Sequence, residues 1–171
     1  MSENPLSHVF QRNCKPGIPN SDLPLLVWKN RLPEAARGGE AARRLFEENG
    51  WTGTWIYTVY PFWHFHTKGH EVLACVAGHA EIGFGGESGV TLEITVGDVC
   101  VVPAGVGHKR VNASSDFRMA GGYPPGQEGD IISPGDLDDE TIERALAQVE
   151  LPQTDPVTGE GWSSASSFKE E

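Results

Sequence analysis

Apolar and polar residues alternate with a period of two through much of the segment 51–123, which is the pattern of half-buried β-strands. Every second residue from Val90 to Val96 is apolar, and threonine or glutamate stands between them. Residues 80–84 repeat the pattern, and the glycine-rich segment 85–89 predicts a hairpin that joins the two strands. Further strands are expected at 54–60, 71–77, 99–103, 108–113 and 117–123. Such short and evenly spaced strands predict a sandwich or a barrel.

Two segments have the period of an amphipathic helix instead. Residues 38–49 place Ala42 and Phe46 on one side, and residues 138–149 place Ile142 and Leu146 on one side. We expect the first of these helices to pack against the outside of a sheet.

The ends of the chain are rich in turn-forming residues. Residues 1–37 contain two short strand candidates, 6–10 and 25–30, and we interpret them as an arm. Residues 151–171 are rich in proline, serine and glycine, which predicts an extended arm ending in a disordered tail. The expected organisation is an N-terminal arm and helix (1–50), a barrel core (51–125), and a C-terminal helix with an extended tail (126–171). Because no internal repeat is present, we expect a single barrel.

Composition narrows the class of protein. The 171 residues correspond to about one domain. Lysine and arginine number 13 against 24 aspartates and glutamates, and the net charge of −11 argues against nucleic-acid or anionic-membrane partners. The three cysteines form no CxxC pair, which favours a reducing compartment. The N-terminus lacks the pattern of a signal peptide, so we expect a soluble cytoplasmic protein.

Histidines carry the clearest chemical signal. His64 and His66 stand two apart, so on a strand both imidazoles point to the same face. Glu71 follows five residues later, and His108 lies in a turn rich in glycine and proline. Imidazole and carboxylate ligands together suit a divalent transition metal such as Fe, Mn, Ni or Zn, among which the sequence does not choose; Cu(II) also accepts such a set.

The spacing around the first pair matches a known motif. That motif consists of glycine, five residues, HxH, three or four residues, glutamate, six residues and glycine. His64, His66, Glu71 and Gly78 satisfy it, whereas Thr58 stands where the leading glycine is expected. The leading position shapes the strand, so this departure leaves the ligand set intact.

A second motif surrounds the distant histidine: glycine, five residues, PxG, two residues, histidine, three residues and asparagine. Gly97, Pro103, Gly105, His108 and Asn112 satisfy every element. With this double match over residues 58–112, the chain resembles the cupin superfamily, and as a whole it is similar to uncharacterised single-domain bacterial cupins.

The resemblance implies an all-β fold, a double-stranded β-helix or jelly-roll cupin barrel, with two short flanking helices. It also implies that His64, His66, Glu71 and His108 converge inside the barrel as a three-histidine, one-glutamate metal site. On this view Gly97 and the bend at 103–105 have structural roles, and the bend aims His108 inward.

His70 and Glu71 are adjacent, and both have side chains that can bind a metal. Neighbours on a strand point to opposite faces, so we expect Glu71 to reach the metal and His70 to point away or to support the site. His79 is expected on the surface. Tyr123 is a candidate to contribute a hydroxyl, and aromatic residues between 55 and 65 are candidates to line the pocket.

The favoured function is a metal-dependent, dioxygenase-type oxidoreductase that acts on a small organic molecule, with Glu71 as the candidate catalytic base. Isomerase and lyase chemistry stays open, as does a non-catalytic module that binds or senses a small molecule. A homodimer is also expected, because residues 23–28 are apolar and have no partner within their own short segment.

Overall fold

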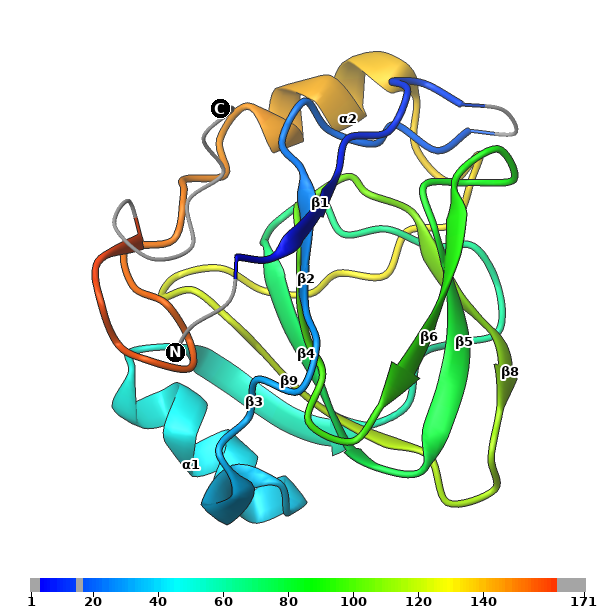
Figure 1. Ribbon diagram of the computed structural model, residues 1–171. Helices are drawn as coiled ribbons and strands as arrows, with labels where there is room; N and C mark the ends of the chain where they lie inside the picture. The colour runs from blue at the N-terminus through cyan, green and yellow to red at the C-terminus, as the bar shows by residue number, and fades with distance from the viewer. Residues whose placement is uncertain (1–3, 15–16, 163–171) are drawn as a thin grey trace.

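The computed structural model describes residues 4–14 and 17–162 of the chain. Within these ranges short strands dominate, and helices are few (Figure 1). The elements in chain order are β1 (Leu6–His8), β2 (Leu25–Trp28), the 3₁₀ helix η1 (Glu34–Ala36), α1 (Gly39–Glu48), β3 (Thr52–Tyr57), β4 (Glu71–Ala77), β5 (His79–Phe84), β6 (Val90–Thr95), β7 (Val99–Val102), β8 (His108–Ala113), β9 (Arg118–Tyr123) and α2 (Asp139–Leu146). None of the described helices has both the length and the apolar character needed to cross a membrane.

The strands form two antiparallel sheets that enclose a common core. The larger sheet has the order β1-β2-β7-β4-β9-β3 and the smaller one the order β6-β5-β8, and Figure 1 shows the two on opposite sides of the barrel. Leu73, Cys100 and Met119 from the larger sheet pack against Ile82 and Phe84 from the smaller one. The prediction of an all-β jelly-roll barrel with two short flanking helices is confirmed.

The hairpin of β5 and β6 follows directly from the sequence pattern. Ala80 pairs with Ile94 and Phe84 pairs with Val90, so the apolar residues share one face. Gly85 and Gly86 in the connection have φ angles of 89° and 99°, a region that residues with a Cβ rarely adopt. The glycines therefore allow the turn that sets this register.

The larger sheet is covered on both faces, unlike the smaller one. All four residues of β7 are buried, so its sequence is continuously apolar rather than alternating. On the outer face, Val72 and Val101 pack with Ala42 and Phe46 of α1. The predicted packing of the first helix on the outside of a sheet is present here.

The N-terminal arm is part of the barrel. β2 pairs with both β1 and β7, and each of its four residues is buried. Leu25 and Val27 face the inner core, whereas Leu26 and Trp28 belong to the outer one. The strands expected at 6–10 and 25–30 are thus present as β1 and β2, and β2 joins the predicted arm to the larger sheet. Because the same chain buries these residues, they give no support for the homodimer, which stays a prediction.

The segment after α2 packs on the same outer face. Val157 and Trp162 are buried in the outer core. Asp155 is fully buried, and its Oδ2 lies 2.7 Å from Nη2 of Arg31, whose guanidinium lies 4.3 Å from the centre of the Trp28 ring. The expected extended tail is therefore folded as far as residue 162. The disorder predicted for the end of the chain concerns 163–171, which lie outside the described residues.

The buried ion pair allows a test of this C-terminal packing. Asp155→Ala should lower the free energy of unfolding by about 3–5 kcal/mol, because it leaves the Arg31 guanidinium without its buried partner. It also removes the acceptor for the Val157 and Thr158 N–H groups. Urea unfolding measures the change.

The matched control is Glu140→Ala, which removes an exposed partner of Arg144 and should change the unfolding free energy by less than about 0.5 kcal/mol. An Asp155→Ala loss no larger than that of the control would contradict the role assigned to the pair.

Candidate metal centre

His64 and His108 face each other across an isolated backbone bridge. The His64 N–H donates to the His108 carbonyl at 3.2 Å, and the His108 N–H donates to the His64 carbonyl at 2.9 Å. The neighbouring Phe65 pairs with Ile132 in the same way. His64 and His66 therefore lie on a loop held by two bridges rather than on a regular strand. The alternation of side chains survives, because Phe65 is buried away from the two imidazoles.

Backbone carbonyls fix the orientation of all three imidazoles. Nδ1 of His64 lies 2.9 Å from the Phe62 carbonyl, and Nδ1 of His108 lies 3.0 Å from the Val106 carbonyl. Nδ1 of His66 contacts the Asp130 carbonyl. A carbonyl only accepts, so each Nδ1 carries the proton and Nε2 is left as the ligand atom.

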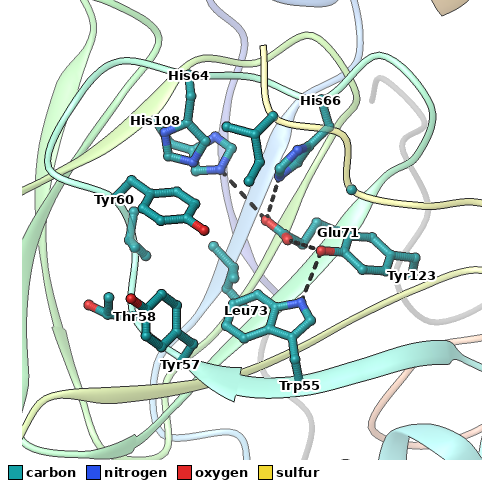
Figure 2. Close-up of a pocket in the computed structure, with 13 residues that line it drawn as sticks. Trp55, Tyr57, Thr58, Tyr60, His64, His66, Glu71, Leu73, His108 and Tyr123 are labelled. Atoms are coloured by element: carbon teal, nitrogen blue, oxygen red, sulfur yellow. Dashed lines mark hydrogen bonds and ion pairs between the residues drawn. The ribbon is translucent and has the colours of Figure 1, made fainter. Parts of the chain in front are cut away.

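The three side chains form a compact cluster (Figure 2). One ring nitrogen of each histidine lies within 4.8 Å of those of the others, and all three residues are buried. An ion with bonds of about 2.0–2.1 Å to each nitrogen would need them within about 4.2 Å of one another, so a small contraction of the cluster would bring all three into reach. Among the described residues, this cluster has the geometry of a metal site.

Glu71, at the start of β4, adds a carboxylate to the cluster. Its Oε1 lies 3.1 Å from Nε2 of His66 and 3.6 Å from Nε2 of His108. Its Oε2 accepts a hydrogen bond of 2.9 Å from the Tyr123 hydroxyl, which in turn accepts one of 2.9 Å from the Trp55 indole N–H. The structure thus brings together all four residues that the motifs selected, and it places Tyr123 behind the carboxylate.

Burial and charge set the protonation states of the ion-free cluster. The His64 pKa is lowered to about 3, mainly by burial and then by His108. Burial also disfavours a charged His66, but the adjacent Glu71 outweighs it and raises the His66 pKa to about 9. Burial disfavours the charged Glu71 as well, yet His66 and His108 hold its pKa far below the usual range. The carboxylate is therefore ionised, and a positive charge at His66 balances it.

His70 lies outside the cluster, as the alternation along β4 predicts. It is buried, and its Nδ1 accepts a 2.9 Å hydrogen bond from the Ala104 N–H. Ala104 belongs to the bend before β8, where Gly105 has a φ of 94° and donates its N–H to the His66 carbonyl. His70 therefore supports the bend that positions His108. His79 is exposed, as expected.

The cluster opens into a cavity of about 340 Å³, which is within the usual size range of small-molecule sites. Besides the four cluster residues, its lining is mostly aromatic and aliphatic. These residues are Trp55, Tyr57, Thr58, Val59, Tyr60, Leu73, Tyr123, Gly129 and Ile131. The aromatic run and Tyr123 were expected from the sequence. Gly129 and Ile131 were not, because they lie on a connecting segment after β9 that carries no motif.

The chain has the jelly-roll barrel fold of the cupins, with both motifs around one buried histidine cluster. The protein YjlB of Bacillus subtilis (strain 168), described as uncharacterized, is 38% identical to it over 143 residues, 83% of this chain and 84% of YjlB. The chain belongs to the same family as YjlB. No family model matches the chain.

Several solved structures resemble the chain at low identity. An acireductone dioxygenase from Bacillus anthracis, with a cadmium ion in its active centre, is 16% identical with a TM-score of 0.37, over 52% of this chain and 60% of that one. A point mutant of the Bacillus subtilis oxalate decarboxylase OxdC is 16% identical with a TM-score of 0.41, over 80% of this chain and 35% of that one. The chain thus spans less than two thirds of the length of each.

The hydroxyl behind Glu71 gives a test of the geometry. Tyr123→Phe should weaken the binding of a divalent metal about tenfold, because it frees the outer carboxylate oxygen that Tyr123 holds. Competition with a coloured chelator measures the change. Tyr57→Phe is the matched control, since it removes a hydroxyl from the mouth of the same cavity. Equal affinities for the two variants would mean that Tyr123 does not position the carboxylate.

Proposed function

We propose that the protein is a metal-dependent enzyme that acts on a small organic molecule, as a dioxygenase-type oxidoreductase. One divalent transition metal, Fe, Mn, Ni or Zn, would be held by His64, His66, His108 and Glu71. The observation that supports this most directly is the set of three buried imidazoles whose Nδ1 atoms are all committed to backbone carbonyls beside a buried carboxylate. A barrel that needed only structural stability would not require such a set.

The donor set fits a metal by its chemistry. Neutral imidazoles suit Fe, Ni and Zn, and histidines with one carboxylate suit non-haem Fe(II) in oxygenases. When bound, such an ion supplies Lewis acidity, and as Fe(II) also the capacity to activate O₂. The cavity borders the cluster, so a small molecule can reach it.

Glu71 is the candidate catalytic residue of this chain. Its Oε1 faces the imidazoles of His66 and His108 and would bind the metal, and its Oε2 is held by Tyr123. The carboxylate would therefore accept a proton at Oε1 only on leaving the ion transiently. Burial and Glu71 raise the Tyr123 pKa, which keeps the phenol protonated as a donor. Glu71 is 3% exposed, and this burial strengthens the electrostatic interactions of its carboxylate.

A metal titration of purified protein tests the site. After incubation with Fe(II), Mn(II), Ni(II) or Zn(II), elemental analysis should find one ion per chain, and the ion should raise the unfolding temperature. Glu71→Ala should weaken binding by more than about 100-fold, whereas His70→Ala should weaken it about tenfold or less, because His70 acts through the bend at Ala104. A site that stays empty with all four metals, or equal losses for the two variants, would overturn the assignment.

The reaction class needs a separate measurement. Metal-loaded protein incubated with a mixture of small-molecule metabolites should consume a compound together with dissolved O₂, and metal-free protein should consume neither. Turnover without O₂ uptake would instead support an isomerase or a lyase. Retention of a compound without conversion would support a binding or sensing module.

The cytoplasmic location and the homodimer remain proposals, and light scattering against the chain mass of 18.5 kDa tests the dimer.

A further inference from the structure

The two ends of the cavity differ in chemistry. The inner end holds the histidines and Glu71, whereas rings and aliphatic groups form the wall toward the mouth (Figure 2). At the mouth, Tyr57 is 56% exposed and Ile131 is 46% exposed, and nearby Phe62 is 43% exposed. Large apolar groups at this level of exposure around one opening mark a surface that a ligand covers.

The aromatic wall is fixed before any ligand arrives. The Tyr60 ring stacks on Phe62 with centroids 5.3 Å apart, and it meets Tyr57 edge-on at 6.1 Å and His64 edge-on at 5.5 Å. These contacts form a continuous row of rings from the mouth to the cluster. A rigid row of rings favours a flat apolar ligand, because little side-chain freedom is lost on binding.

The charges around the cavity disfavour ligands that carry a second anionic group. Among the described residues that line the cavity, there is neither a lysine nor an arginine. Arg110 donates to the Thr58 hydroxyl at 2.8 Å, but it lines a different surface depression. A second anionic group on a ligand would therefore lack a cationic partner, and the net charge of −11 would repel it.

A divalent ion held by three neutral imidazoles and one carboxylate keeps a single net positive charge, which one ionised oxygen of a ligand neutralises. Resting on the function proposed above, we infer that the ligand has a chelating oxygen head with one negative charge and an uncharged, ring-sized apolar body. The head meets the metal, and the body lies along the Tyr57–Tyr60 row and emerges beside Ile131. Phosphorylated compounds and dicarboxylates or tricarboxylates are excluded.

Three hydroxamic acids with the same head test this inference. They are acetohydroxamic acid, benzohydroxamic acid and 4-carboxybenzohydroxamic acid, which carry a methyl group, an apolar ring and a charged ring. On protein loaded with Co(II) as a spectroscopic substitute, benzohydroxamic acid should bind about tenfold more tightly than either of the others. Calorimetry gives the affinities, and the visible spectrum of Co(II) reports binding at the metal.

A charge placed at the mouth should change this preference. Ile131→Arg adds a cation at an exposed wall position, so the ratio of affinities for the uncharged over the charged ring should fall at least threefold. Leu151→Arg makes the same kind of change at a residue that is 53% exposed and lies outside the cavity lining, and it should leave the ratio unchanged.

The outcomes separate the two proposals. Metal uptake with binding of acetohydroxamic acid at the metal supports the metal site alone. If the metal binds but the three probes bind equally, or the charged ring binds most tightly, the inference about the ligand is overturned and the metal site stands. If no metal is taken up, both are overturned. An equal effect of Ile131→Arg and Leu151→Arg would place the ligand body elsewhere.

Discussion

The charge of the Glu71 carboxylate, 3% exposed inside an apolar barrel, is the constraint on which this end of the molecule depends. A buried charge without partners costs several kcal/mol, so its neighbours must be held in place. His66 and His108 lie at Oε1 and Tyr123 lies at Oε2. Glu71 and Tyr123 belong to β4 and β9 of the larger sheet, whereas His108 begins β8 of the smaller one. The carboxylate therefore links the two sheets at the point where the cavity opens.

The same constraint governs the imidazoles, whose hydrogen-bond partners at Nδ1 are neutral. Carbonyls of Phe62, Val106 and Asp130 accept at Nδ1, so no further negative charge enters the cluster. The carboxylate of Asp130 points elsewhere and accepts from the Thr67 N–H at 2.7 Å and the Lys68 N–H at 3.1 Å. Asp130 thus uses its side chain to hold the strap after β9 and its main chain to orient His66. One residue thus helps to position both the strap that carries Ile131 and the candidate ligand His66.

The parts of this structure that could be predicted from sequence are those encoded within short distances along the chain. Alternation predicted the β5–β6 hairpin, and motif spacing selected Glu71 over its neighbour His70 because adjacent strand residues face opposite ways. The strand at β2 was expected but its pairing with β7 was not, and the packing of the segment around Asp155 was not expected either, since a short apolar run or a proline-rich stretch does not reveal which distant surface it covers. The bridges that hold the site loop at 64–66 to His108 and Ile132 were not expected, because such bridges have no local signal. Ile131 was missed for the same reason.

The residues of the cluster and the residues at the cavity mouth lie on different parts of the fold. Glu71 and His108 begin β4 and β8, and His64 and His66 lie on a loop that two backbone bridges hold, so the geometry of the cluster is tied to the barrel. Tyr57 ends an edge strand, and Phe62 and Ile131 lie on connecting segments, where a substitution disturbs few backbone hydrogen bonds. The mouth can therefore change its shape and charge while the cluster stays intact. Among proteins with this barrel, the cluster would set the kind of chemistry and the connecting segments would set the ligand.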